Sequence, residues 1–319
     1  MAVYTDVSIE ELETFLENYD IGSPRVFKGI AEGVSNSNYF LQTDKASFIL
    51  TLYEKRIETD ELPFFLNLME HLAARGAPCP TPVHANDGST TSTLNGRSAA
   101  ILTFLEGVSL RRPSAEHCSL AGHALATLHL QGASFPQQRE NALGLTSWKT
   151  LAAECETGAE KVTSDLRTLI DAELEFLSVN WPDSLPSGII HADFFPDNVL
   201  FVKKKVSGII DLYFACRDAF SYDLAVTLNA WCFEADGSYN VTKGQSLFSG
   251  YESVRALEQN ERDTFHILCR GAALRFLLTR LYDWLNHSPD AFVNPKNPTE
   301  FVRRLRFHQG ARGPEAYGL

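Results

Sequence analysis

The stretch HADFFPDNVLFVKKKVSGIID, residues 191–211, places Asp193, Asn198 and Asp211 around what reads as a short β-hairpin. Asp193 comes just after the apolar run GII, and Asp211 directly follows SGII. Phosphoryl transfer needs one carboxylate to orient an attacking hydroxyl, together with oxygen ligands for the Mg²⁺ ions that bridge the phosphates. The pattern therefore predicts Asp193 as the catalytic base and Asn198 with Asp211 as metal ligands.

Other interpretations of this stretch stay open. One acid after a strand is often only a surface turn, although three oxygen-bearing side chains at strand ends are less expected by chance. His191, Asp193, Asp197 and Asp211 could instead form a metallohydrolase cluster, because histidine and carboxylates bind transition metals. Such a site would normally need more histidines at matched spacing, and the other eight show none. We therefore expect the ring of His191 to brace the loop by a hydrogen bond to the backbone.

Composition limits the class of protein. The chain has 319 residues, 44% of them hydrophobic, which is enough for a substantial core in one large or two modest domains. A net charge of -12 and no basic cluster larger than the three lysines at 203–205 argue against nucleic-acid binding. Six scattered cysteines favour reduced thiols over zinc or disulfides. We expect a cytoplasmic protein without a membrane span, because neither a leader pattern nor a run of about 18 apolar residues occurs.

Local patterns divide the chain into a sheet-rich part and a helical part. Ser8 and Glu11 form a capping-box pattern before a short apolar helix, and residues 58–75 have helical apolar spacing. Asn95 and Gly96 separate two strand-like runs, which predicts a tight hairpin. Further helices are expected at residues 114–132, 221–233, 257–286 and 299–308, with residues 191–211 as the one β-rich segment among them.

Several segments resemble a known family. HADFFPDN followed by IIDLYFACRD resembles the catalytic and metal loops of the aminoglycoside phosphotransferase and choline kinase group, which is related to the protein kinases. GVSNSNYFLQT, FILTLYEKR, ELPFFLNLMEHLAARG, AAILTFLEG, HALATLH and SYDLAVTLNAWCF together resemble its homoserine kinase branch. The resemblance implies an α+β, two-lobed protein kinase-like fold, with a small antiparallel sheet lobe at residues 1–105 and a larger, mainly helical catalytic lobe at residues 106–319.

The resemblance also implies an activity and roles for residues. It implies an ATP-dependent kinase that transfers the γ-phosphate of ATP to the hydroxyl of L-homoserine in threonine biosynthesis, with ATP between the lobes and Mg²⁺ as cofactor. Asp193 would orient or deprotonate that hydroxyl, and Asn198 with Asp211 would hold Mg²⁺. The nucleotide would be bound by Gly33, Ser35, Asn36 and Ser37 in a loop over the phosphates, and by Thr103 and Glu106 in the connector beside adenine.

Two features depart from the protein kinase pattern. Thr51 stands in FILTLYEKR where protein kinases have a lysine that pairs with phosphates. Lys55 or Arg56 could reach in from the strand end, or the two could be an ordinary exposed cluster. The loop before residue 38 has only Gly29 and Gly33, so small polar side chains or backbone amides would have to contact the phosphates.

The acceptor is the least determined part of the prediction. A zwitterionic substrate needs a cation for its carboxylate, and Arg275 in an apolar helical stretch is the candidate, although snorkelling or a salt bridge would also explain an arginine there. Choline, ethanolamine, methylthioribose or aminoglycoside kinases are alternatives, as is a pseudokinase that only binds nucleotide. The expected partners are ATP and L-homoserine; the sequence does not indicate an oligomeric state.

Overall fold

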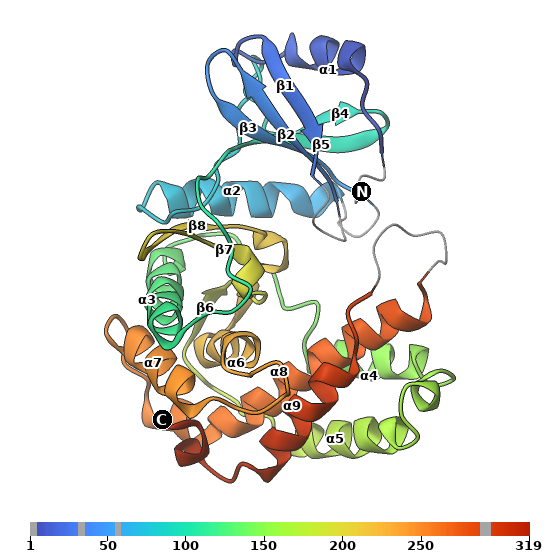
Figure 1. The fold of residues 1–319 in the computed structure, drawn as a ribbon, viewed down its shortest axis with the longest axis vertical. Helices are drawn as coiled ribbons and strands as arrows, with labels where there is room; N and C mark the ends of the chain where they lie inside the picture. The colour runs from blue at the N-terminus through green and yellow to red at the C-terminus, as the bar shows by residue number, and fades with distance from the viewer. Residues whose placement is uncertain (1–4, 31–35, 55–58, 288–294) are drawn as a thin grey trace. The chain divides into compact units, whose positions relative to one another are not determined.

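The computed structural model describes residues 5–30, 36–54, 59–287 and 295–319, and its chain divides into two compact units (Figure 1). The first holds the described residues of Met1–Gly107 together with Ser207–Tyr213. The second holds the described residues of Val108–Val206, Phe214–Pro289 and Asn294–Leu319. The lobe boundary between residues 105 and 106 stays a prediction about functional organisation. The division by contacts differs from it because it assigns Ser207–Tyr213, and therefore Asp211, to the first unit.

The first unit is built on a five-stranded antiparallel sheet with the strand order β1-β2-β3-β5-β4. Its strands are β1 (Pro24–Gly29), β2 (Ser37–Thr43), β3 (Ser47–Leu52), β4 (Ser92–Leu94) and β5 (Arg97–Thr103). The predicted hairpin is confirmed: Asn95 and Gly96 join β4 to β5 with φ values of 51° and 72°. Both residues are left-handed, as the two central positions of a type I′ turn require.

One face of this sheet carries the core of the first unit. In β2 and the first half of β3 alternate residues are buried, because successive side chains of a strand point to opposite faces. Helix α1 (Ile9–Leu16) adds Leu12, Phe15 and Leu16 to the same cluster as Leu41 and Leu50. The capping box predicted at Ser8 is confirmed. Helix α1 therefore begins where its sequence predicts, and its apolar side covers the sheet.

Helix α2 (Leu62–Ala73) also belongs to the first unit, and it runs crosswise below the sheet in Figure 1. Its predicted start was too early: Thr59–Glu61 form a 3₁₀ turn, and residue 58 lies outside the described residues. Pro63 sits in the first turn, where a missing N–H leaves no hydrogen bond unmade. Gly76, with φ of 87°, follows the helix.

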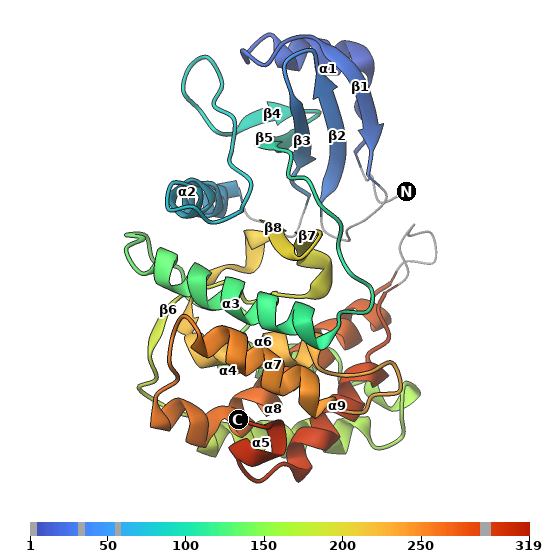
Figure 2. The same cartoon turned by 60° about the vertical axis from the view of Figure 1, so that its left-hand side comes forward.

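Helices dominate the second unit (Figure 2). They are α3 (Ala115–Gly132), α4 (Leu145–Glu154), α5 (Leu166–Asn180), α6 (Phe220–Trp231), α7 (Val241–Glu252), α8 (Gln259–Leu285) and α9 (Thr299–Gly310). α3 and α7 lie side by side at close range. A Cβ atom on Gly122 would lie 2.1 Å from the carbonyl oxygen of Leu247, so only glycine fits there. Four helices were predicted within a few residues of their ends, whereas α4, α5 and α7 were missed.

Two small sheets accompany these helices. β6 (Ser187–Ile190) pairs antiparallel with β9 (Cys216–Ala219), and β7 (Val199–Val202) pairs with β8 (Lys205–Ile209) as the predicted hairpin. The expectation that residues 191–211 are the one β-rich segment was too narrow, because β9 lies beyond it and reaches β6 by a long-range pairing. In the described part of the chain, no helix is both long and apolar enough to cross a membrane.

Candidate active site

Asp193 and Asn198 meet on one short loop of the second unit. This loop follows β6 and ends in the 3₁₀ turn Pro196–Asn198. The side-chain amide of Asn198 donates to both the carbonyl oxygen of Asp193, at 2.8 Å, and its carboxylate Oδ2, at 3.0 Å. The amide is thereby oriented with its nitrogen toward Asp193. The structure thus brings the predicted base and one predicted metal ligand together.

His191 braces this loop, as predicted. Its side chain is fully buried, and its Nδ1 accepts the backbone N–H of Asp193 at 3.2 Å. Its ring also packs edge-to-face against Phe194. His191 therefore fixes the backbone amide of Asp193 from behind.

A buried carboxylate holds the start of the loop. Asp223, in the first turn of α6, accepts the backbone N–H groups of His191 and Ala192, both at 2.8 Å. Ala192 has φ of 62°, a left-handed conformation that a non-glycine residue adopts only at a cost of about 1 kcal/mol or more. The carboxylate offsets this cost by binding the amides. Sequence reasoning did not single out Asp223; the signal was an acid among the apolar residues of SYDLAVTLNAW.

Asp223 is in turn held by a chain of buried polar groups. His129 in α3 lies 3.0 Å from Asp223 through Nε2 and 2.8 Å from the hydroxyl of Tyr251 through Nδ1. Arg255 donates to that hydroxyl and makes two hydrogen bonds to Glu261. The loop at residues 191–198, which we name the catalytic loop after the role predicted for Asp193, is therefore connected to α3, α7 and α8.

Within this series of hydrogen-bonded groups, Asp223 and His129 differ in their charge. Burial opposes ionisation of Asp223, but its bonds from His129 and from the backbone keep the pKa of this carboxyl below its ordinary value. Burial lowers the pKa of His129, against the opposing effect of Asp223. The pair is therefore a carboxylate and a neutral imidazole, in which Nε2 donates to Asp223 and Nδ1 accepts from Tyr251.

The carboxyl of Asp193 is half-buried among charges of both signs. Burial raises its pKa above the ordinary value, and the neighbouring side chains of Arg275 and His191 oppose the shift. The negative charge of Asp197 raises the pKa of Asp193 further, whereas the positive charge of Lys296 lowers it. Lys296 itself pairs with Asp197 at 3.2 Å. A carboxyl with a raised pKa is better suited to accept a proton near neutral pH than an ordinary surface aspartate.

Arg275 does not lie at the surface of the second unit. Its side chain is 2% exposed, and its Nη1 donates to the carbonyl oxygen of Ala192. The rings of Phe276 and Phe214 lie 4.4 and 5.6 Å from its guanidinium carbon. Its role as the binder of a substrate carboxylate stays a prediction, and the structure places its guanidinium behind the catalytic loop.

Asp211 lies in the first unit, where it follows β8. It is exposed and left-handed, with φ of 62°. Near it, the hydroxyls of Tyr53 and Tyr213 are 2.9 Å apart, and burial raises the pKa of both tyrosines. These hydroxyls are therefore neutral, and their pairing anchors the turn after Asp211 to the end of β3.

The third strand has no cation at the position that the sequence singled out. Thr51 is 2% exposed, and its hydroxyl donates to Asn38 Oδ1 at 2.8 Å across β2 and β3. Lys55, the predicted substitute, lies outside the described residues, as does Arg56. At this position of β3, the structure therefore has a hydrogen bond between two neutral side chains, Thr51 and Asn38, in place of a cation.

Asn36 and Ser37 lie beside Glu54. The hydroxyl of Ser37 donates to Glu54 Oε1 at 2.8 Å and accepts the N–H of Thr5 at 3.1 Å. Asn36 Oδ1 accepts the N–H of Glu54 at 3.3 Å. Both side chains hold the ends of β2 and β3 together in this structure. The other two predicted loop residues, Gly33 and Ser35, lie outside the described residues.

The predicted connector residues take part in backbone contacts of the first unit. The N–H of Thr103 donates to the carbonyl of Thr81, whose own N–H donates to the hydroxyl of Thr103. The carbonyl of Glu106 accepts the hydroxyl of Ser207 at 2.7 Å. Adenine contacts by Thr103 and Glu106 therefore stay predictions, and the N–H of Thr103 is already used.

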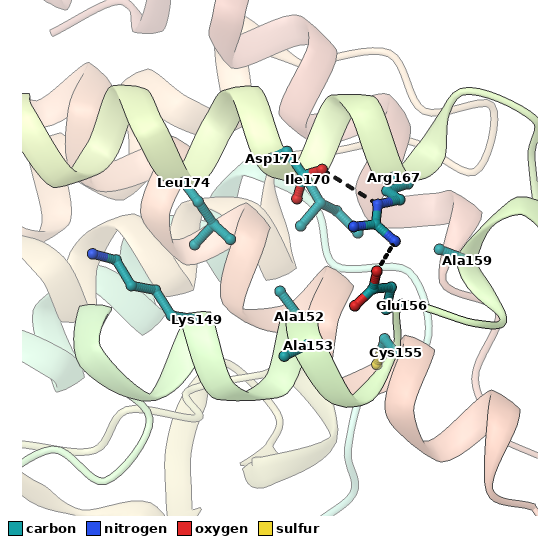
Figure 3. Close-up of a pocket in the computed structure, with 10 residues that line it drawn as sticks. All are labelled: Lys149, Ala152, Ala153, Cys155, Glu156, Ala159, Arg167, Ile170, Asp171 and Leu174. Atoms are coloured by element: carbon teal, nitrogen blue, oxygen red, sulfur yellow. Dashed lines mark hydrogen bonds and ion pairs between the residues drawn. The ribbon is translucent and has the colours of Figure 1, made fainter.

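A hollow of about 200 Å³ lies between α4 and α5, away from the catalytic loop (Figure 3). Arg167 points between Glu156 and Asp171 and forms ion pairs with both. Ala152, Ala153 and the other small or apolar residues that line it leave the space open. Because three of its four charged side chains, Glu156, Arg167 and Asp171, are paired with one another, we assign it no ligand.

The donor set has the chemistry of a magnesium site. Amide and carboxylate oxygens, as on Asn198 and Asp211, are hard ligands, and Mg²⁺ bound to phosphates needs only one or two protein ligands. Asn198 turns its amide nitrogen toward Asp193, which leaves its oxygen for other partners. Residues 5–30, 36–54, 59–287 and 295–319 contain no group of three or more histidines, cysteines or acids that could hold a metal, as the metallohydrolase alternative would need.

Comparison with known proteins identifies the family of this chain. The model of the phosphotransferase enzyme family matches residues 26–257. A homoserine kinase of Xanthobacter autotrophicus is 57% identical over 319 residues, which is 100% of this chain and 99% of the relative. A homoserine kinase of Paramagnetospirillum magneticum is 54% identical over 325 residues, covering both chains completely. The resemblance inferred from the sequence is confirmed.

Solved structures show the same fold at low sequence identity. An amicoumacin kinase in complex with AMP-PNP, Ca²⁺ and Ami has a TM-score of 0.70 at 10% identity, covering 97% of this chain and 95% of that one. A spectinomycin phosphotransferase in complex with ADP and spectinomycin has a TM-score of 0.67 at 15% identity, with 95% of each chain covered. The predicted protein kinase-like fold is therefore confirmed, with a sheet-based first unit and a helical second unit.

Proposed function

The chain belongs to the phosphotransferase enzyme family and, within it, to the homoserine kinases; on this premise we propose that it transfers the γ-phosphate of ATP to the hydroxyl of L-homoserine. It is a kinase with a hydroxyl group as acceptor. The product, O-phosphohomoserine, is a step toward threonine. Similarity over the whole chain to relatives with that name supports this acceptor over choline, ethanolamine or an aminoglycoside.

One observation of the structure carries the proposal. Asp193 and Asn198 are joined by two hydrogen bonds on a loop whose backbone is held by Asp223. A loop fixed in this way presents a carboxylate at one defined position, which is what the orientation of a hydroxyl nucleophile requires. A surface turn that carried the same residues by chance would not need buried anchors.

The reaction on this site is a direct displacement. The acceptor hydroxyl donates a hydrogen bond to the carboxylate of Asp193 and attacks the γ-phosphorus as the bond to the β-phosphate oxygen breaks. The hydroxyl proton passes to Asp193, whose pKa is raised by burial. ADP leaves, and the phosphate ester forms on the acceptor oxygen. Asn198 keeps Asp193 oriented throughout.

We propose Mg²⁺ as the cofactor, held by Asn198 and Asp211. When bound, it would neutralise negative charge on the phosphates during the transfer. We also propose that the protein works in the cytoplasm. All six cysteines are buried free thiols, which suits a reducing compartment.

The test is a magnesium-dependent assay of ADP formation with homoserine, choline, ethanolamine, methylthioribose and an aminoglycoside, run with the wild type and Asp193→Asn. We expect turnover with homoserine in the wild type and a loss of at least about 10³-fold in the variant, with ATP affinity little changed. Turnover with another acceptor alone would replace the proposed substrate. ATP binding without turnover on any of them would identify a pseudokinase.

A further inference from the structure

Arg275 is a buried cation in an apolar part of the second unit. It stands midway along α8, its side chain 2% exposed, between the rings of Phe276 and Phe214. Removing a guanidinium from water costs several kcal/mol unless hydrogen bonds replace the water. Its Nη1 donates to the carbonyl oxygen of Ala192, and its Nε has no partner among the described residues. The guanidinium therefore combines a hydrogen bond to one backbone carbonyl with electrostatic interactions with Asp193, Asp218 and Tyr222.

That carbonyl stands at a strained position. Ala192 is left-handed, and its two flanking peptide groups are held by opposite charges. The N–H of Ala192 donates to Asp223 Oδ1, and the C=O of Ala192 accepts from Arg275. The second of these peptide groups leads into Asp193, whose N–H donates to His191. The peptide before Asp193 is therefore fixed at its oxygen by Arg275 and at its nitrogen by His191.

We propose that Arg275 is a positioning residue for phosphoryl transfer: by holding the carbonyl of Ala192, it fixes the direction in which Asp193 presents its carboxylate to the acceptor hydroxyl. The inference rests on the proposed function. It assigns the guanidinium of Arg275 to the catalytic loop and not to the binding of the acceptor's carboxylate. Arg275 contacts neither substrate nor phosphate in this role.

Charge and shape both matter to this role. The guanidinium is planar and donates from fixed directions, whereas a lysine ammonium is a shorter-reaching point charge. Arg275→Lys keeps the positive charge but not the geometry of the bond to Ala192. Arg275→Met keeps much of the apolar packing against Phe276 and loses both charge and bond. The two variants separate positioning from packing.

The same helix offers a matched control. Arg280 also lies over an aromatic ring, with Phe301 at 4.4 Å, and it is also largely buried. It pairs with Glu300 of α9 at 2.5 Å, whereas Arg275 binds the carbonyl of Ala192. Arg280→Lys therefore makes the same chemical change in the same helix without touching Ala192.

The experiment measures kcat and KM for homoserine in the full-length wild type, Arg275→Lys, Arg275→Met and Arg280→Lys, with thermal unfolding of each. The proposal expects Arg275→Lys to lower kcat by at least about tenfold, with KM for homoserine within about threefold of the wild type. Arg275→Met should lower kcat further, and Arg280→Lys should keep it within about threefold.

Other patterns overturn the proposal. A rise in KM that exceeds the fall in kcat would make Arg275 a binder of the acceptor, and unchanged kinetics in Arg275→Lys would remove it from the reaction. An equal loss of kcat in Arg280→Lys would show a packing effect of the helix. If Arg275→Met does not fold, Arg275→Lys decides. If the wild type phosphorylates another acceptor of the panel instead of homoserine, the proposed function fails alone, and the same comparison is made on that acceptor.

Discussion

Two fully buried histidines of the second unit, His129 and His308, have similar hydrogen-bond partners but support different parts of the structure. Each reaches helix α6 through Nε2 at 3.0 Å, His129 to Asp223 and His308 to Asn229 Oδ1. Each also meets a tyrosine hydroxyl through Nδ1, at 2.8 Å for His129 and 3.0 Å for His308. Only the first pair touches the catalytic loop, through Asp223.

The difference lies in the residue on α6. Asp223 only accepts, and three donors converge on it: His129 and the backbone N–H groups of His191 and Ala192. Asn229 both accepts from His308 and donates to the carbonyls of Ala225 and Cys269. A carboxylate suits the first site, where three N–H donors need acceptors. An amide suits the second site, where the residue must both accept a hydrogen bond and donate two. The buried negative charge of Asp223 is thus found at the site that holds the catalytic loop.

Replacing Asp223 by Asn should break this comparison with the largest effect. The amide would have one oxygen for three donors and would turn its NH₂ toward at least one of them. We expect kcat to fall by about 10²-fold or more because the loop loses its anchor. The free energy of unfolding should fall by about 3 kcal/mol, since buried donors lose their partner. Steady-state kinetics and urea unfolding measure both, and a kcat within threefold of the wild type would refute the anchoring role.

Acid should act strongly on the second histidine. Burial, and then the charges of Arg304 and Arg270, lower the pKa of His308 to about 3, from an unfolded value of 6.5. Between these values the unfolded chain binds a proton that the folded protein does not. The contribution of neutral, buried His308 to the free energy of unfolding is therefore complete above pH 6.5. It is lost as the pH falls toward 3, at up to about 1.4 kcal/mol per pH unit.

His308→Gln tests this dependence, because it removes the titrating ring. The urea-unfolding free energy of the variant should fall less steeply between pH 6.5 and 4 than that of the wild type. His123→Gln, a change of an exposed histidine on α3, is the control and should keep the wild-type slope. Equal slopes in all three proteins would show that His308 does not titrate as its burial requires.

Asn229→Asp makes the second pair resemble the first. The new carboxylate would lose the two bonds that Asn229 donates to the carbonyls of Ala225 and Cys269. We expect a loss of about 2 kcal/mol in the free energy of unfolding near neutral pH, because two buried helix carbonyls lose their side-chain donor and face a carboxylate instead. Since this pair lies away from the catalytic loop, kcat should stay within about twofold. A large loss of kcat with a folded protein would contradict the separation of the two pairs.

The tyrosines give the smallest and most closely matched test. Tyr251→Phe and Tyr317→Phe each remove one hydroxyl from a buried histidine, at an expected cost of about 1 kcal/mol. Only Tyr251→Phe should lower kcat, by a few-fold, because only His129 supports Asp223. Denaturant curves and initial rates on the two variants separate the effects. Equal kinetic losses in both would show that the two pairs do not differ in function.

Features that depend on neighbouring residues could be predicted from the sequence. The capping box at Ser8, the hairpin at Asn95 and Gly96, and the placement of Asp193 and Asn198 on one loop each involve residues at most five positions apart. A side chain and a backbone group so close in the chain meet in almost any compact fold. These predictions are confirmed for that reason.

Features that depend on distant segments were missed. Helix α7 has glycines at 244 and 250, which weaken its helical signal, and it is stabilised by its close packing on α3. β9 was missed because four residues become a strand only when β6 pairs with them. Asp223 was passed over because it reads as one acid near the start of a helix, although in the structure it is fully buried.

By itself, the sequence determined the family and the class of chemistry, and it placed Asp193 and Asn198, whose catalytic and metal-binding roles stay predictions, on one short loop. Only the tertiary structure decided how that loop is held. Asp223 is 30 positions beyond Asp193 and Arg275 is 82 beyond it, so no local pattern announces their contacts with Ala192. Two buried charges from α6 and α8 are needed there because a left-handed alanine does not keep its conformation unaided.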